Sequence, residues 1–447
     1  MSLPMPKPPA TWPEPRRRAV RAGPTLETVE LALELVTPVL GGAAVPRTID
    51  EVDIVRVPSI RGQLRFWWRA LNLQRSKAPA ELHTKESELF GRAAEKEGGR
   101  SEVEICLHVL ARGGCDTQDI ELGKTPGDYA LFPARSERKG KPDEKPPAPR
   151  RKPGTQFTLE LRAPKERLEE LRPVLRAWIL FGGYGSRTRR GLGSLTVTGA
   201  DKASWLPKEA SLAEFERLFS RDVFAQEVVP AELAQTPRLA GASLLVGEPV
   251  AGAEQAWTTA LNWLRDFRQG TNTGARQPGG ANRPSISNWP EADKIRHLTG
   301  KTRSHKPRYG EDPAWPRAAF GLPIVGQFQK AARGGGTYDE PGPFELTWKD
   351  GEGLHNRLAS PLIVKAMPLA NERFVPIALW LERAWPPDGE VVLRMGGQEK
   401  PGSAAPFDKL LGEKDPALFP PLEGKSSLRD AFLDWLGSEK KATRIAG

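Results

Sequence analysis

Residues 59–71 read SIRGQLRFWWRAL, and this stretch predicts an amphipathic helix over residues 59–74. An α-helix turns by about 100° per residue, so residues three and four positions apart share a face. The apolar side chains of the stretch then form one stripe, made of Ile60, Leu64, Trp67, Trp68 and Leu71. We expect this stripe to face the core, and we expect both tryptophans to be core residues and not platforms for stacked bases.

Three arginines, Arg61, Arg65 and Arg69, follow the helix edge beside the apolar stripe. Like charges four residues apart destabilise a helix, so the row predicts a neutralising partner. That partner is either the phosphates of a nucleic acid or carboxylates on neighbouring elements. Ser59 is expected to cap the helix, and the free amides of the first turn also favour a phosphate. We take the three arginines as candidate RNA contacts.

The segments around this helix predict an α+β fold. Strands are expected at residues 27–37, 102–110, 156–162 and 194–198, and a second helix is expected at 166–181. The order strand, helix, strand, strand, helix, strand is typical of ferredoxin-like domains, which include the RNA-recognition folds. The sequence therefore predicts a first ferredoxin-like domain over residues 24–202.

The second half carries a similar but weaker pattern. Helices are expected at residues 253–268 and 426–438, the latter capped by Ser426 or Ser427. Strands are expected at residues 321–329, 343–348, 358–367, 373–381 and 390–395. We predict a second ferredoxin-like domain over residues 203–447, with a basic insertion at 269–310 and a C-terminal helix.

Residues 181–194 read FGGYGSRTRRGLGS, with five glycines and three arginines between positions 182 and 193. Glycines let backbone amides approach a phosphate, and arginines add bidentate donors. The spacing fits neither a Walker loop nor a dinucleotide-binding fingerprint. A tight structural turn is the alternative, and it would explain two or three of the glycines. The candidate RNA contacts here are Gly182, Gly183, Gly185, Ser186, Arg187, Arg189, Arg190, Gly191 and Gly193, and we expect the arginine side chains to support little of the core.

The net charge of +10 is concentrated in three Pro-, Gly- or Ser-rich stretches, residues 1–23, 131–155 and 269–310. The first is predicted to be a disordered arm and the other two to be long loops. Mobile basic loops suit a polyanion such as nucleic acid, and an arginine-rich solvated surface is the alternative. Candidate RNA contacts in the third stretch are Lys301, Arg303, Lys306 and Arg308.

Composition excludes several classes of protein. Two cysteines, Cys106 and Cys115, make no disulfide framework and suggest a reducing cytoplasm. No apolar run is long enough to span a membrane, and the N-terminus lacks the apolar region of a secretory signal. We therefore expect a cytoplasmic protein without a membrane partner.

No catalytic, metal-binding or cofactor-binding motif is predicted. Cys106, His108 and Cys115 lack an obvious fourth zinc ligand, and His108 on its strand is expected to pack in the core. His297, His305 and Tyr309 lie in the third basic stretch, where a histidine could act as a general base for RNA cleavage. We favour a solvated loop that contacts RNA.

Four segments together carry a resemblance to a known family. They are residues 37–42 (TPVLGG), 57–69 (VPSIRGQLRFWWR), 182–194 (GGYGSRTRRGLGS) and 357–364 (RLASPLIV). The chain resembles the RAMP proteins, specifically the family of the first RAMP subunit of the Cmr complex, the type III-B CRISPR effector. The resemblance is specific over residues 25–200 and thinner over 310–395.

The resemblance implies two packed ferredoxin-like domains without catalytic activity. It implies a seat near the 3′ end of the guide RNA, a role in capturing target RNA in antiviral defence, and other RAMP subunits as partners. The Arg-rich helix and the glycine-rich loop of the family correspond to Arg61, Arg65, Arg69 and residues 182–194. Two alternatives stay open: a metal-independent RAMP endoribonuclease that processes guide precursors, and a scaffold that binds only proteins.

Overall fold

The computed structural model describes residues 25–92, 98–138, 140, 142–269, 276–277, 286–330 and 336–447. The arm predicted at residues 1–23 lies outside the described residues, as do most of residues 270–285 in the predicted basic insertion. Helices and antiparallel strands alternate through the described part of the chain, which confirms the α+β class.

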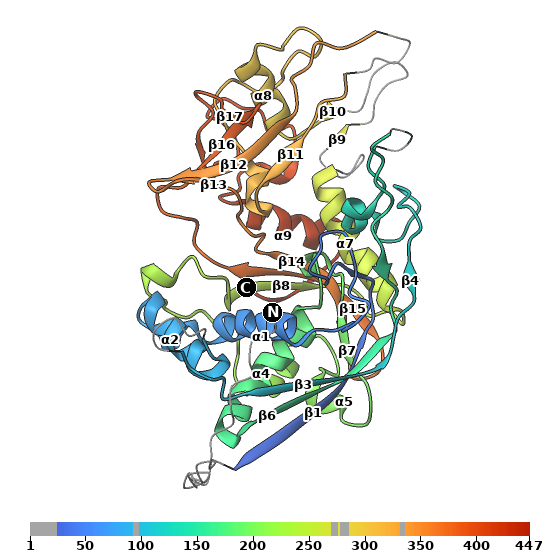
Figure 1. The fold of residues 1–447 in the computed structure, drawn as a ribbon. Coiled ribbons are helices and arrows are strands. Elements are labelled where there is room, and N and C mark those ends of the chain that lie inside the picture. The colour runs from blue at the N-terminus through green and yellow to red at the C-terminus, as the bar shows by residue number, and fades with distance from the viewer. Residues whose placement is uncertain are drawn as a thin grey trace, which may run out of the picture.

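The first half contains a four-stranded antiparallel sheet with helices on one face (Figure 1). Along the chain its elements are β1 (Leu26–Leu35), α1 (Val57–Asn72), β3 (Glu104–Ala111), β6 (Thr155–Pro164), α4 (Lys165–Phe181) and β7 (Leu195–Val197). The sheet order is β3-β6-β1-β7. This element order agrees with the strand, helix, strand, strand, helix, strand pattern that the sequence predicts.

Alternation along the strands decides which side chains enter the core. Leu31 lies opposite Leu159 and Leu33 opposite Phe157, and all four are buried under the helices. The outer face is polar, with Glu30 opposite Glu160 across β1 and β6. His108 on β3 belongs to this outer face, and its side chain is 67% exposed. The expectation that it packs in the core is wrong, because the strand register turns it to the polar side.

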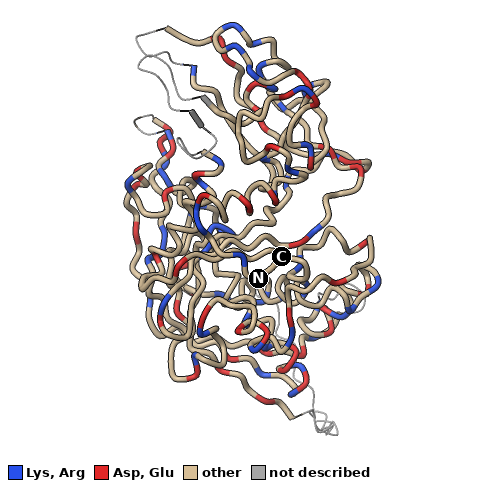
Figure 2. Tube along the Cα trace, turned by 180° about the vertical axis from the view of Figure 1, so that it is seen from behind, with Lys and Arg blue, Asp and Glu red and all other residues tan. Residues whose placement is uncertain are grey.

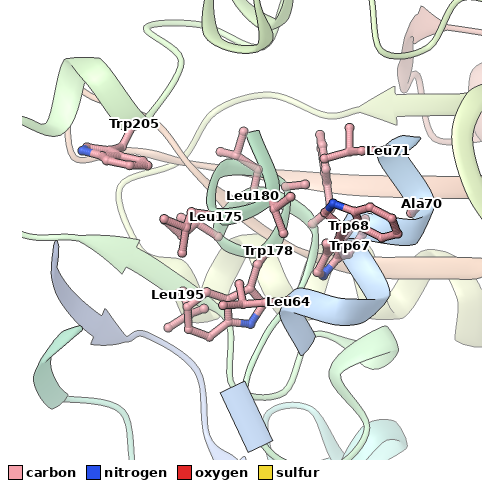
Figure 3. Packing of buried hydrophobic residues seen from close by; sticks show 14 of the residues in the cluster. Leu64, Trp67, Trp68, Ala70, Leu71, Leu175, Trp178, Leu180, Leu195 and Trp205 are labelled. Carbon is pink, nitrogen blue, oxygen red and sulfur yellow. The ribbon is translucent and has the colours of Figure 1, made fainter. Parts of the chain in front are cut away.

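Helix α1 packs its apolar stripe against α4, as the sequence predicts. Figure 3 shows Leu64, Trp67, Trp68 and Leu71 meeting Trp178 of α4 in one cluster. The helix begins at Val57 with Arg56 as its N-cap and a proline in its first turn. The expectation that Ser59 caps it is therefore wrong.

A second unit has the same topology as the first. Its elements are β8 (Arg238–Val246), α7 (Ala253–Gln269), β14 (Leu362–Pro368), β15 (Phe374–Glu382), α9 (Leu428–Glu439) and β19 (Thr443–Ala446). All strand pairs are antiparallel, in the order β14-β15-β8-β19. Ser427 caps α9 by accepting from the amide of Asp430, as predicted. The strands β8 and β19 were not predicted, although they supply the first and last strands of the unit.

The two units stack as alternating layers (Figure 1). One continuous core holds the first sheet, α1, α4 and one face of the second sheet, including Leu244 and Ile377. The other face of the second sheet, including Leu245 and Trp380, packs against α7 and α9. The second sheet is therefore buried on both faces, and a long apolar contact joins the two halves.

A third sheet lies beyond α7 and α9 and was not predicted as a separate part. Its strands are β11 (Ile324–Gly326), β12 (Phe344–Asp350), β13 (Gly353–His355), β16 (Glu390–Met395), β17 (Gln398–Glu399) and β18 (Ala405–Pro406). They come from two insertions, one between α7 and β14 and one between β15 and α9. With α8 (Glu291–Thr299), they enclose a core of their own that includes Trp315, Leu346 and Val391. The strands predicted near residues 321, 343 and 390 belong here and not to the second unit.

The predicted basic loop between β3 and β6 is largely ordered. It contains β4 (Cys115–Asp116), α3 (Asp128–Leu131), η2 (Phe132–Ala134) and β5 (Arg150–Arg151), and β5 pairs with β2 (Val39–Leu40). Arg150 and Arg151 are buried, and each pairs with a carboxylate, at 2.7 Å to Asp116 and 3.2 Å to Glu51. These two basic residues hold the insertion in place and are not free for a polyanion.

The remaining described elements are short or peripheral. They are η1 (Leu73–Arg75), α2 (Pro79–Phe90), η3 (Thr188–Arg190), α5 (Lys202–Trp205), α6 (Leu212–Phe219), η4 (Ala231–Leu233), β9 (Arg276–Gln277), β10 (Ile286–Ser287), η5 (Pro316–Phe320) and η6 (Pro420–Leu422). Figure 2 shows basic and acidic residues interspersed over every layer, so no single lobe carries the positive charge.

Candidate nucleic-acid interface

The glycine-rich segment forms a compact turn between α4 and β7, built around η3. Arg187 precedes η3 with φ 59° and Gly191 follows it with φ 78°, both left-handed. A left-handed backbone favours glycine, which is the residue at position 191. The turn reverses the chain within a few residues. The turn meets β14 of the second unit, so its three arginines lie at the junction of the two units.

Four of the predicted glycines are buried, namely Gly182, Gly183, Gly191 and Gly193. A Cβ at Gly191 would lie 2.4 Å from Cδ1 of Trp257, and one at Gly193 would lie 1.9 Å from the carbonyl oxygen of Tyr184. Close packing therefore requires these glycines. The prediction that Gly183, Gly191 and Gly193 contact RNA finds no support, because protein atoms cover them. Gly182 lines a smaller cavity described below and stays a predicted contact.

The backbone amides of the turn are also largely occupied. The amide of Ser186 donates to the carbonyl of Leu40 at 2.8 Å, and that of Gly193 donates to the carbonyl of Pro38 at 2.9 Å. A donor already satisfied by protein is not available to a phosphate. Gly185 and Ser186 reach the surface and stay predicted contacts, and the phosphate-binding capacity of the segment rests on its arginines.

Arg190 ties the two units together. Its guanidinium donates to the carbonyl of Leu362 at 3.0 Å and to Oγ of Ser360 at 3.3 Å. Its own carbonyl accepts from Nε1 of Trp257 on α7 at 2.7 Å. The expectation that this arginine supports little of the structure is wrong, because both ends of the residue hold the second unit.

Arg187 and Arg189 make fewer contacts. Arg187 donates to the carbonyl of Ala130 on α3 at 3.1 Å. The guanidinium of Arg189 lies over the ring of Phe66 on α1, 5.5 Å from its centroid. Neither of them, nor Arg190, forms an ion pair within the described residues. Arg187 is exposed, whereas Arg189 and Arg190 are half-buried. A half-buried cation without a counter-charge favours an external anion.

A cavity of about 690 Å³ opens beside these arginines, and its lining residues come from the insertion between β3 and β6, the glycine-rich turn, the end of α7 and segments near β11 and β14. Its basic residues are Arg187, Arg189, Arg190, Arg265 and Arg268. The last two come from the end of α7, and Arg265 pairs with its neighbour Asp266 at 3.0 Å. The cavity has one acidic residue, Asp128, whose carboxylate accepts from the amides of Gly123 and Tyr129 at 2.6 Å each.

The electrostatics of the cavity favour an anion. Burial, reinforced by the positive charge of Arg268, lowers the pKa of Arg190 to about 9. Burial also lowers the pKa of Arg189. A lowered pKa means that the folded protein destabilises the charged form of these arginines. A bound phosphate would offset that destabilisation. Nε of Arg268 is buried and has no hydrogen-bond partner within the described residues.

A second cavity, of about 360 Å³, shares Arg187 and Arg189 with the first. It extends along α1 past Gln63 and Phe66. The two cavities form a track from α1 of the first unit to β11 of the third sheet, with arginines where they meet. A chain of phosphates is the anion that suits an extended track of this kind.

The arginine row of α1 is only partly free. Glu86 of α2, whose side chain is 4% exposed, pairs with Arg69 at 2.7 Å and with Arg65 at 3.5 Å. For these two residues the alternative interpretation, neutralisation by a neighbouring carboxylate, is the one observed. Arg61 forms no ion pair within the described residues and stays a predicted RNA contact.

The candidate residues of the third basic stretch lie apart from the arginine cavity. They follow α8 in the lobe at the top of Figure 1. Lys301 pairs with Asp339 at 2.7 Å, and Arg308 donates to the carbonyl of Ser287 at 2.9 Å. Arg303 and Lys306 are exposed. The structure therefore does not bring this group together with the glycine-rich turn.

The residues considered for catalysis are held in structural contacts. His305 contacts the carboxylate of Glu340, which also accepts from Nε of Arg296 at 3.0 Å. Tyr309 is 2% exposed, and burial raises the pKa of its hydroxyl. Nε2 of His297 lies 2.9 Å from the carbonyl oxygen of Tyr309. Residues 291–310, expected to be a loop, form α8 and this polar network.

Sequence reasoning missed several residues of the cavity. Arg265 and Arg268 end a helix that was predicted, and their spacing of three residues places them on one face. That spacing, next to a helix end, was the available signal. Tyr129 and Phe132 belong to the insertion between β3 and β6, whose composition suggested only a loop.

Lys365 on β14 is another residue that the sequence did not single out. It is fully buried, and its Nζ donates to the carbonyls of Ile179 at 3.0 Å and Gly182 at 2.8 Å. These carbonyls end α4 and begin the glycine-rich turn. Burial lowers the pKa of Lys365 to about 7. The lysine therefore joins the glycine-rich turn to β14 of the second unit through two hydrogen bonds.

The described residues give little support for a metal site or a membrane-spanning helix. There, no three His, Cys, Asp or Glu side chains gather as metal ligands. In the same part of the chain, the helices are too short or too polar to cross a membrane.

Comparison with known proteins finds a family model that matches most of the first unit. Residues 32–196 match the model of the RAMP superfamily. The crystal structure of Cmr1 from Pyrococcus furiosus is similar at 15% sequence identity and a TM-score of 0.48, over 95% of this chain and 99% of that one. A chain of the cryo-EM structure of the type III-B Cmr-beta bound to cognate target RNA is similar at 12% identity and a TM-score of 0.44, over 80% and 94% of the two chains. No curated protein sequence matches.

Proposed function

We propose, from the match of residues 32–196 to the RAMP superfamily, that the chain is an RNA-binding RAMP subunit of a type III-B CRISPR effector. It acts without catalysing a reaction. Its two units of strand, helix, strand, strand, helix, strand order are ferredoxin-like RAMP domains, and its arginine cavity binds the RNA backbone.

The observation that carries this proposal is the cavity between the two units. Five arginines line it against a single aspartate, and that aspartate is already satisfied by backbone amides. Three of these arginines, Arg187, Arg189 and Arg190, belong to the glycine-rich turn, which lies inside the segment that matches the family. Guanidinium groups without carboxylate partners are the usual means of binding phosphates.

In the effector, we place the chain near the 3′ end of the guide RNA, where it helps to capture target RNA. Its partners are then guide RNA, target RNA and the other RAMP subunits of the Cmr complex. This role comes from the family resemblance of residues 37–69 and 182–194. The arginine cavity supplies the contact with RNA that such a role needs.

The endoribonuclease alternative has weaker support. It needs a histidine or tyrosine that reaches a 2′-hydroxyl. Tyr309 is buried, and His305 is engaged by Glu340 in the third sheet's lobe. A scaffold that binds only proteins would leave the unpaired arginines of the cavity without a role.

The test is titration of the full chain with single-stranded RNA at several salt concentrations, followed by analysis of the RNA. We expect affinity to fall steeply with salt and the RNA to stay intact. The double variant Arg187→Gln/Arg268→Gln should bind at least about tenfold more weakly, with a salt slope lower by one to two units.

The matched control is Arg75→Gln/Arg100→Gln, which removes the same charge from exposed arginines outside the cavity. It should bind almost as the parent chain does. Equal losses in the two double variants would contradict a localised site. Absence of RNA binding would favour the scaffold, and products with 2′,3′-cyclic phosphate ends would favour the endoribonuclease.

A further inference from the structure

Exposed apolar side chains gather at the same cavity as the arginines. Nine large hydrophobic side chains are exposed in the described residues. Three of them line this cavity: Leu122 at 56%, Phe132 at 44% and Val325 at 74% exposure. Phe132 is the only aromatic residue among the nine. A cavity that joins exposed apolar side chains to cations needs a ligand with both kinds of surface.

Two arginines that do not line the cavity, Arg135 and Arg47, support Phe132. The guanidinium of Arg135 stacks on the ring of Phe132 at 4.0 Å from the centroid. Arg47 donates to the carbonyls of Pro133 at 2.8 Å and Arg135 at 3.1 Å. It also donates to the carbonyl of Pro146 at 2.8 Å. These bonds fix the backbone on the C-terminal side of Phe132, so the ring is a preorganised surface.

Two further aromatic side chains, those of Tyr129 and Phe320, line the same cavity. The guanidinium of Arg268 lies 5.5 Å from the centroid of the Phe320 ring. Aromatic rings and guanidinium groups therefore both line the cavity. That combination recognises a nucleobase together with its flanking phosphates.

We infer that the cavity binds an unstacked base of single-stranded RNA on Phe132, while Arg187, Arg190 and Arg268 hold the neighbouring phosphates. This inference rests on the proposed function and narrows its ligand to single-stranded RNA. In an A-form duplex the faces of the bases are stacked on one another and cannot reach Phe132. The site therefore takes RNA that is not paired, with little preference for the identity of the base, because every base has a π-face.

The test compares two RNA oligomers on the full chain, one of ordinary nucleotides and one of equal length with a run of abasic positions. We expect the parent chain to bind the ordinary oligomer about tenfold more tightly. The Phe132→Ala variant should bind the ordinary oligomer no more tightly than the abasic oligomer. Phe132→Tyr should restore the preference, because tyrosine keeps the ring. A 2-aminopurine in the ordinary oligomer should report stacking only with the parent chain and Phe132→Tyr.

The matched control is Leu110→Ala, which removes a side chain that is 66% exposed and outside the cavity. It should leave both affinities unchanged. Equal binding of the two oligomers by the parent chain, or full stacking by Phe132→Ala, would overturn the inference while leaving the proposed function intact. Binding of neither oligomer would overturn both. A preference for duplex RNA, or displacement of both oligomers by an acidic peptide at similar concentration, would overturn the inference alone.

Discussion

Two arginine-rich regions of the same unit differ in whether their arginines have a carboxylate partner. On α1, Arg65 and Arg69 share one carboxylate partner, Glu86 from α2. At the glycine-rich turn, Arg187 and Arg189 form no ion pair within the described residues, and Arg268 from α7 adds a further cation. Equal arginine content therefore does not mean equal function. The two regions differ in whether a neighbouring element places a carboxylate next to the arginines.

The largest expected effect comes from removing that carboxylate. Glu86→Ala leaves Arg65 and Arg69, which are each only about a third exposed, without a counter-charge, so we expect about 2–3 kcal/mol of lost stability. RNA affinity at native conditions should stay unchanged or rise slightly. Chemical denaturation and RNA titration on the same variant check both statements. If stability is kept and RNA binding collapses, Glu86 organises the RNA site itself.

Lys365 gives a pH test of a cation that is buried without a carboxylate partner. Burial lowers its pKa from the ordinary 10.5 to about 7. Above about pH 7 the folded chain releases this proton while the unfolded chain keeps it, so stability should rise with pH from 7 towards 10. The gain between pH 7 and 9 should be about 2 kcal/mol.

Lys365→Met removes the titrating group and should flatten that rise. The measurement is denaturant unfolding of the parent chain and the variant across pH 6–9.5. Parallel pH profiles for the two chains would mean that Lys365 keeps its charge throughout, with the carbonyls of Ile179 and Gly182 as sufficient partners.

A smaller effect is expected at Arg189, which stacks on Phe66. Arg189→Gln should cost about 0.5–1 kcal/mol of stability, the usual value of a partly exposed cation–π contact. RNA affinity should fall by a few-fold, because one of several cations is lost. Thermal melting and RNA titration measure the two effects. Unchanged RNA binding would show that Arg189 makes no contact with RNA in either of the two cavities that it lines.

The smallest effect on RNA is expected for Arg65→Gln/Arg69→Gln. These arginines already have a carboxylate partner, so their loss should change RNA affinity by less than about twofold. The variant carries the same change in charge as Arg187→Gln/Arg268→Gln. A comparable loss of affinity in the two variants would erase the distinction between the regions.

The sequence predicted the first unit well because its elements are local and regular. The apolar stripe of α1 and the alternation of β1 are readable from consecutive residues. The strand β8 escaped prediction because RLAGASLLV is buried on both faces and shows no alternation. The third sheet escaped because β12 pairs with β16 across a long separation along the chain, which no local pattern reveals.

The candidate site was predicted in part. The arginines of the glycine-rich turn were found from composition, and they do line the cavity. Their glycines were misread, since the neighbour that requires Gly191 is Trp257 in the other unit. The pairing of Arg69 could not be predicted, because Glu86 lies on a helix that the sequence did not indicate.

The most direct test of the central claim is to locate RNA on the full chain by photo-crosslinking single-stranded RNA that carries 4-thiouridine, with peptides identified by mass spectrometry. We predict crosslinks in residues 122–132, 187–190, 265–268 and 320–325, the segments that meet at the arginine cavity. Crosslinks confined to α1 near Arg65 and Arg69, or to the outer face of the first sheet, would contradict the account.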